Sequence, residues 1–511
     1  MGIGKLERRA HLLPVAMIVA LFTVALAQPS LAELRAQVEQ EPENVEAWIN
    51  LGNAYLAEDR FEPAKDSFLE AIALEYRSGD AHFGLGLAEF GRGDYQAALF
   101  AFNEVTRLYP DRFDGHYNRA VTLTRLRRPD DAAAAFREAV DQAQPEAAPP
   151  EIADAYIGLA GQLTRSARFG EAAEAYENAL ANEPETDPNE LRYLRADALY
   201  RAGRGLEALP DLTDLEGISS DYRVSSLIAD IYVDQGQVDY ALRSLERALR
   251  KARTAENASV QANVLVKLGL LQRQIGRDAE AAASFQQAAE VDASSWEALY
   301  NLGVSYLESD QAASAVQVLE EALDVPGAGG EVELALASAY DRTGRVAEAA
   351  NSARGAIASL DAPELQAQAR LILGRALYRE GQFTEAAILF ALVVQERPGD
   401  PQAQLWAGLA EYRQGNYRTA AQYYERAVQL APNSAEARAN LGAAYLANER
   451  FRDAEAVYEL LVQQNPQDAE SHFNLGWALM SQNRRAAARE AWQRAGELGY
   501  DAAAQALNDY F

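Results

Sequence analysis

Apolar side chains recur along this chain at the spacing of an amphipathic helix. Near the start, Trp48, Leu51 and Tyr55 lie three and four residues apart, so one helix presents all three on a single face. Ala64 and Phe68 begin a second apolar stripe a few residues later. In comparable places along the chain, short turns with a central glycine separate two such stretches, as at 92–94 and 414–416. The pattern therefore predicts pairs of helices joined by short turns.

This helix pair repeats at intervals of about 34 residues. A small residue in the first helix is followed twelve residues later by an alanine, and four residues after that by a bulky apolar residue. The clearest examples are Gly52, Ala64 and Phe68; Gly303, Ala315 and Leu319; Gly442, Ala454 and Tyr458; and Gly476, Ala488 and Trp492. We expect the small residues where the two helices of a unit cross and their backbones approach. The units are expected to start at 45, 79, 113, 153, 189, 222, 262, 296, 330, 367, 401, 435 and 469.

The repeated pattern resembles that of the tetratricopeptide repeat (TPR) family, whose units are helix–turn–helix pairs. The resemblance covers roughly nine-tenths of the chain, in about thirteen units. It implies an all-α fold, a right-handed α-solenoid superhelix. No unit in such a fold buries its own apolar face, so stability comes from the stacking of neighbours.

The repeats divide the chain into predicted segments. Residues 1–27 are a signal peptide or membrane anchor, 28–44 an N-terminal capping helix, 45–221 a first arm of repeats, 222–502 a second arm, and 503–511 a C-terminal cap in which Tyr510 and Phe511 fold back.

Three places break the regular spacing. Insertions at 147–152 and 256–261 are expected to be loops. Pro210 falls inside a second helix, and proline disrupts a helix interior, so we expect a bend or hinge within 203–221. A locally irregular but rigid unit is the alternative.

The N-terminus has the features of a secretory signal peptide. Lys5, Arg8 and Arg9 precede an uncharged, mostly apolar run over 12–27, which ends Ala-Leu-Ala. We expect cleavage after Ala27 and export to the periplasm or cell envelope of a bacterium. An uncleaved membrane anchor is the alternative, and the rest of the chain crosses the inner membrane in either case.

Composition narrows the choice of function. The formal net charge is −29 at pH 7, and so acidic a surface repels nucleic-acid backbones, so no nucleic-acid partner is expected. The chain has no cysteine, which excludes disulfides, thiolate metal sites and cysteine nucleophiles.

The sequence predicts no catalytic group, metal site, cofactor or small-molecule substrate. His82, His116 and His472 share the fourth position of their repeats, where packing histidines are expected. A metal shared by His82 and His116, in a metal-dependent enzyme, is the alternative. Residues 84–86 read Gly-Leu-Gly but lack the lysine of a phosphate-binding loop.

The resemblance also implies a binding surface, because in this family the first helix of each repeat lines a concave groove. The groove positions are the second, fifth, ninth, twelfth and thirteenth of each repeat. They hold Tyr117, Arg125, Arg165, Tyr193, Tyr200 and Arg201 in the central repeats, and Arg375, Tyr378, Arg379, Tyr412 and Arg413 in later ones. We expect these side chains to bind an extended or helical peptide that carries acidic groups, through Arg–carboxylate contacts. Solvated arginines that balance nearby acids are the alternative.

The C-terminal end of the groove is more apolar, because it includes Phe473 and Trp477. Partners there are expected to bind by burial of apolar side chains. The sequence as a whole therefore predicts a non-catalytic scaffold or adaptor that binds proteins or peptides in the cell envelope. The alternatives are a membrane-anchored assembly factor for pilus, secretion or polysaccharide-export machinery, a metal-dependent enzyme, and a self-assembling repeat.

Overall fold

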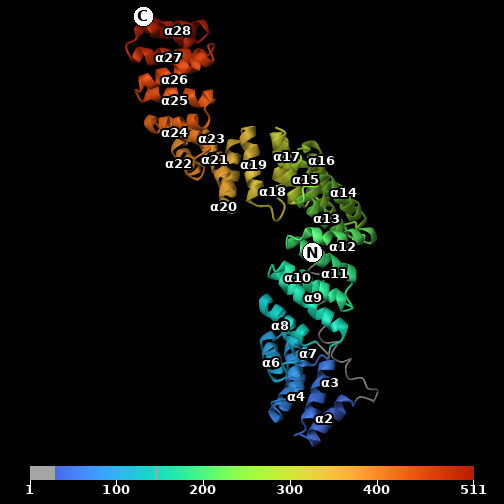
Figure 1. Cartoon of the computed structure of the whole chain (residues 1–511). Helices are drawn as coiled ribbons and strands as arrows, with labels where there is room; N and C mark the ends of the chain where they lie inside the picture. The colour runs from blue at the N-terminus through green and yellow to red at the C-terminus, as the bar shows by residue number, and fades with distance from the viewer. Residues whose placement is uncertain (1–28, 144–146) are drawn as a thin grey trace. The chain divides into compact units, whose positions relative to one another are not determined.

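The computed structural model describes residues 29–143 and 147–511, and the predicted signal peptide lies outside these residues. The described residues fold into 28 α-helices and no strand. The helices pack in successive helix–turn–helix pairs, as the sequence predicts (Figure 1).

The helices follow one another with only short connections. Their bounds are α2 Leu31–Gln40, α3 Val45–Ala57, α4 Phe61–Leu74, α5 Gly79–Gly91, α6 Tyr95–Leu108, α7 Phe113–Arg125, α8 Pro129–Asp141, α9 Pro149–Arg165, α10 Phe169–Ala181, α11 Pro188–Arg201, α12 Gly205–Ile218, α13 Tyr222–Asp234, α14 Val238–Thr254, α15 Ala258–Gln274, α16 Asp278–Val291, α17 Trp296–Glu308, α18 Ala312–Leu323, α19 Gly330–Thr343, α20 Val346–Ser359, α21 Pro363–Arg379, α22 Phe383–Glu396, α23 Pro401–Arg413, α24 Tyr417–Leu430, α25 Ala435–Ala447, α26 Phe451–Gln464, α27 Ala469–Ser481, α28 Arg485–Glu497 and α29 Asp501–Tyr510.

The chain forms two compact units, which meet between Lys251 and Ala252 within α14. We describe each unit by itself and name the first helix of every repeat helix A and the second helix B. In each unit, helix A packs on its own helix B, and helix B packs on helix A of the next repeat. Within a unit, neighbouring repeats therefore hold one another, as the stacking of a solenoid requires.

Most A helices begin where the sequence pattern predicts. Nine begin at the expected residue: α3, α5, α7, α13, α17, α19, α23, α25 and α27. Helix α11 begins one residue earlier than expected, at Pro188. The exceptions are α9, α15 and α21, which have 17 residues and begin four residues before the expected starts at 153, 262 and 367.

The predicted loops at 147–152 and 256–261 are therefore wrong for most of their length. Residues 149–152 form the first turn of α9, because Pro149 at the first helical position has a suitable φ and needs no hydrogen-bond acceptor. Residues 258–261 form the first turn of α15, where the side chain of Asn257 accepts a hydrogen bond from the Val260 amide at 3.2 Å. Each insertion lengthens a helix by one turn.

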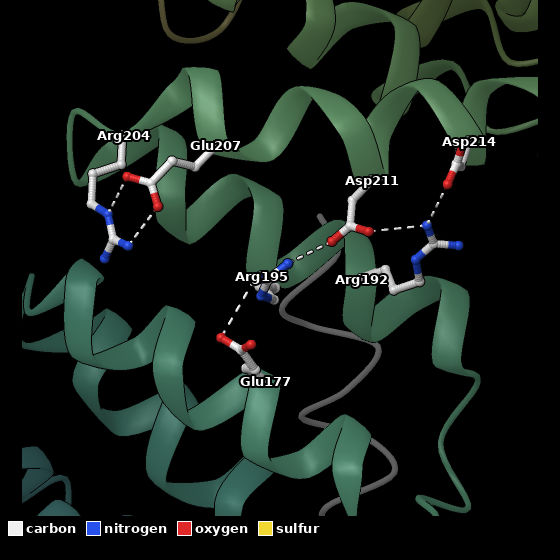
Figure 2. A network of polar contacts seen from close by, with 7 residues as sticks. All are labelled: Glu177, Arg192, Arg195, Arg204, Glu207, Asp211 and Asp214. Atoms are coloured by element: carbon white, nitrogen blue, oxygen red, sulfur yellow. Dashed lines mark hydrogen bonds and ion pairs between the residues drawn. The ribbon is translucent and has the colours of Figure 1, made fainter.

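Pro210 lies inside α12, which continues as a helix from Gly205 to Ile218. Ion pairs connect this helix to its neighbours (Figure 2). Asp211 accepts hydrogen bonds from Arg192 at 3.0 Å and Arg195 at 2.6 Å, both on α11. Arg195 also lies 3.4 Å from Glu177 of α10. Three successive helices are thus joined around the proline. The hinge within 203–221, and the division into arms at 221, stay predictions.

The recurring glycines of the A helices lie against the large side chains of the B helices. Phe68 is fully buried, and a Cβ built on Gly52 would lie only 2.7 Å from its ring. Gly84, in the next repeat, faces the same ring, with a Cβ position 2.3 Å away. The small residues thus make room for a ring rather than for a crossing backbone. The ring of Phe68 thus joins two consecutive repeats.

Both ends of the array carry an extra helix. At the start, α2 has a capping box formed by Ser30 and Glu33, and it buries Leu34 and Val38 beside α3. At the end, α29 packs on α28. Among residues 29–143 and 147–511, no helix has the length and apolar character needed to cross a membrane.

Candidate protein-binding groove

The A helices form the inner side of each stack. An A helix contacts the A helix of the next repeat; for example, α3 contacts α5, and α19 contacts α21. The B helices of successive repeats approach one another less closely. A stack that is tighter on one side curves toward that side. The exposed positions of the A helices therefore line a concave surface within each unit, as the resemblance implies.

In the first unit, the predicted groove residues contact aromatic side chains of the chain itself. Tyr117 is half-buried, with its ring 5.8 Å from the rings of both Phe113 and Phe136. Arg125 lies over the ring of Phe90, at 5.7 Å from its centroid. Such cation–π contacts stabilise an arginine side chain on the surface of the groove.

The other predicted residues of this unit differ in their surroundings. Arg201 is exposed, pairs with Asp197 at 2.9 Å and lies over Phe169. Tyr193 is covered by Arg223, whose guanidinium carbon is 4.5 Å from its ring centroid. Arg165, at the end of α9, is exposed.

Acidic groups surround the tyrosines of this unit. Burial raises the pKa of Tyr200 to about 12, helped by the charges of Asp230, Asp234 and Asp197. Burial also raises the pKa of Tyr117 and Tyr193. This part of the groove is therefore a mixed surface in which aspartates accompany the predicted arginines.

Asp154 is a groove residue that our sequence analysis missed, although it occupies the second position of its repeat. Burial, together with the nearby charges of Glu185 and Glu151, raises the pKa of its carboxyl from the ordinary value of 3.8 to about 6. The folded protein therefore binds a proton at Asp154 more tightly than the unfolded chain does. Its stability consequently falls as the pH rises from about 4 to about 6.

We expect Asp154→Asn to raise the free energy of unfolding by about 1 kcal/mol at neutral pH. This value is smaller than the full pKa shift would give, because the carboxyl is partly exposed and solvent screens its interactions. Near pH 4 the gain should disappear, because Asp154 is then protonated in the folded state. Urea denaturation at the two pH values measures the difference. Glu70→Gln, at an exposed carboxylate in α4, is the control and should change stability by less than about 0.5 kcal/mol at either pH. An equal gain at both pH values would contradict the assignment.

In the second unit, two predicted groove arginines bind the same carboxylate. Arg375 and Arg379, one turn apart on α21, both donate to Asp341 of α19, and the Arg379 Nη1–Oδ1 distance is 2.5 Å. Asp341 is buried, whereas Arg379 is exposed. The two arginines thus link consecutive repeats, and Arg379 keeps donor groups directed to solvent.

The remaining predicted residues of this unit form aromatic contacts. Tyr378 packs against Phe383 at 5.3 Å and Trp406 at 5.6 Å. Arg413 is exposed and stacks over Phe383, 4.4 Å from its centroid. Tyr412 is half-buried beside Tyr417. The structure therefore places Arg375, Tyr378, Arg379 and Arg413 on one stretch of the inner side, with Tyr412 alongside.

The apolar C-terminal groove is partly filled by the end of the chain. Phe473 packs against Trp477 and lies 4.7 Å from Tyr500. The ring of Trp477 lies 5.5 Å from Tyr510, and Phe511 lies against Trp492. Phe473 and Trp477 are half-buried in this cluster, so only part of each is open to a partner.

The histidines have a repeated structural contact. The Nε2 atoms of His82, His116 and His472 each lie within 3.2 Å of the backbone carbonyl six residues earlier, which can only accept, so each Nε2 donates. Trp48 makes the same contact through its indole nitrogen, at 2.9 Å. The fourth position of the repeat thus fixes the turn that leads into helix A. In the described part of the chain, no three His, Asp or Glu side chains are grouped to hold a metal ion.

Comparisons with known proteins identify the family. One tetratricopeptide repeat model matches residues 51–112, 83–148, 163–221, 227–293, 266–330 and 334–401, and a second tetratricopeptide repeat model matches 411–472. The chain is a tetratricopeptide repeat protein. Such proteins are scaffolds for protein–protein interaction and are typically non-catalytic, so this TPR chain is a protein-binding scaffold of about thirteen repeats.

Solved structures of other proteins are also similar to this chain. The APC/C hetero-tetramer Cut9–Hcn1 is 14% identical, with a TM-score of 0.35 over 94% of this chain and 99% of that one. YrrB, described as a TPR protein with an unusual peptide-binding site, is 23% identical, with a TM-score of 0.33 over 38% of this chain and 95% of that one. MamA is 22% identical, with a TM-score of 0.28 over 30% of this chain and 86% of that one. No curated protein matches the chain.

Proposed function

We propose that this TPR protein is an exported scaffold of the bacterial cell envelope, which holds one or more partner proteins against the inner side of its A helices. The single observation that carries the binding proposal is the set of exposed arginines and half-buried aromatic rings on that side, above all Arg379 and Arg413 beside Tyr378. Arginine and tyrosine dominate binding hot spots, because they combine large contact area with directional donors.

Photo-crosslinking in the native host tests whether the inner side binds a partner. A photoreactive amino acid would replace Gln402, at the second position of helix A in its repeat, and in a matched control Gln422 on helix B of the same repeat. Both glutamines are exposed. A discrete adduct from Gln402 that is missing from Gln422 supports binding in the groove, and mass spectrometry then names the partner. Adducts from Gln422 alone would contradict the proposal.

The proposed location rests on the basic start and apolar run of residues 1–27. Fractionation of the host followed by N-terminal sequencing tests it. A periplasmic or envelope protein that begins at Gln28 supports export with cleavage. The full-length chain in the inner membrane supports the anchored alternative, a membrane-bound assembly factor with the same groove. A cytoplasmic protein that keeps residues 1–27 would exclude both.

A further inference from the structure

Two adjoining cavities form one trough in the second unit. The first, of about 380 Å³, is lined by three consecutive A helices, with Tyr300 and Leu307 from α17, Ser338 from α19 and Ile372 from α21. The second, of about 400 Å³, lies at the starts of these helices beside Trp296. The cavities share Glu331 and Leu365, so they are continuous. Their volumes are typical of a site for a few side chains of a ligand.

One end of the trough carries an excess of positive charge. Arg375 and Arg379 both bind the carboxylate of Asp341, and the charge of Arg342 acts on Arg375. Arg342 itself donates to the Leu307 carbonyl at 2.6 Å. Burial lowers the pKa of Arg375, and the positive charges of Arg379 and Arg342 act in the same direction. The negative charge of Asp341 opposes them but does not restore the ordinary pKa. The buried Nε of Arg375 has no hydrogen-bond acceptor. The three arginines thus have donors and charge that Asp341 alone does not satisfy.

The other end of the trough is acidic. Glu331 and Asp361 are exposed at the starts of the helices. Eleven residues of α19 separate Glu331 from Arg342, which corresponds to about 16 Å along the helix axis. An extended peptide covers that length with about five residues.

We propose that this trough binds a short segment of a partner protein in which apolar residues adjoin acidic ones, with its acidic part at Arg342, Arg375 and Arg379 and its apolar side chains in the cavity lined by Ile372 and Ser338. This proposal rests on the proposed function and adds the chemistry of the partner. Charge complementarity supports it, because two arginines share the one carboxylate of Asp341 and Arg342 adds a positive charge near them. The apolar side chains are bound by burial, and the carboxylates take the free guanidinium donors.

The first step of the test lets the protein select its own ligand. Phage that display random dodecapeptides are panned on the immobilised full chain. We expect enrichment of peptides in which one or two large apolar residues adjoin Asp or Glu. Enrichment of basic peptides, or none above panning without protein, would overturn the proposal.

The second step measures where the selected peptide binds. The most enriched peptide is labelled with fluorescein and titrated with each variant by fluorescence anisotropy. Arg379→Glu should weaken binding about tenfold or more, because it reverses an exposed charge at the contact. Arg354→Glu, the same change on the exposed face of α20, should leave the affinity within about twofold. Equal effects of the two variants would overturn the proposal.

Two further variants keep the result independent of folding. Ser338→Phe fills the cavity and should weaken binding without changing any charge. Arg379→Gln replaces the reversed variant if thermal melting shows that Arg379→Glu is less stable. If no peptide binds at this trough while crosslinks still form at Gln402, then this proposal fails and the proposed function stands.

Discussion

Phe68→Ala should lower the free energy of unfolding by about 3–5 kcal/mol, one of the two largest effects we expect from a single substitution. Phe68 is fully buried, and its ring fills the space that Gly52 and Gly84 leave in two consecutive A helices. Alanine removes the ring and leaves a cavity between two repeats. The helix backbones on either side cannot close it without separating from their own neighbours. Urea denaturation followed by circular dichroism measures the loss.

Phe100→Ala is the matched control for this prediction. Phe100 lies on helix B of the next repeat and is 67% exposed, so its loss should cost less than about 0.5 kcal/mol. Because stability in a solenoid depends on nearest neighbours, hydrogen exchange in Phe68→Ala should be faster in α3–α5 and unchanged in α25–α28. Equal losses for the two variants, or faster exchange throughout the chain, would contradict this account.

The fold could be predicted from the sequence because each repeat carries its own signal. The glycine of helix A and the large residue of helix B, such as Gly442 and Tyr458, recur at fixed spacing because they contact each other. Where the pattern misplaced a helix start, a local signal for the earlier start was present in the sequence. Pro149 and Pro363 stand at the first position of helices that begin one turn early.

The groove could be predicted only as a set of positions. Arg375 and Arg379 bind Asp341, which is 34 and 38 residues away, and this pairing depends on how one repeat stacks on the next. A sequence gives the repeat position of each residue but not which carboxylate in the neighbouring repeat lies within reach. The predicted arginines are therefore partly structural, and what remains for a partner is their unsatisfied charge.

A second inter-repeat contact was missed although its spacing recurs. The hydroxyl of Tyr340 donates to Glu320 of the preceding repeat at 2.6 Å, and Arg345 covers the tyrosine ring and pairs with the same glutamate. Tyr445 makes the same contacts with Glu425 and Arg450. A glutamate twenty residues before a tyrosine, with an arginine five residues after it, marks this contact.

Gly476→Ala should destabilise the C-terminal repeats by about 1–3 kcal/mol, although alanine is the better helix former. A Cβ at Gly476 would lie 2.3 Å from the Trp492 ring, well inside contact distance. The ring cannot move away easily, because Trp492 is fully buried and its Nε1 donates to the Phe473 carbonyl at 3.0 Å. Helix propensity favours alanine by about 1 kcal/mol, so the clash must exceed that gain for the variant to be less stable.

Gly161→Ala tests the effect of helix propensity alone and should stabilise the protein, the opposite of Gly476→Ala. Gly161 lies in the interior of α9 with no atom within 4 Å of its Cβ position, so alanine should raise the free energy of unfolding by roughly 0.5–1 kcal/mol. Both variants are compared with the wild type by urea denaturation. A loss at Gly476 together with a gain at Gly161 shows that the repeated glycine is required by the ring opposite it. A gain at both positions would mean that Trp492 can shift at little cost, and that the spacing of glycine and ring does not determine how the repeats pack.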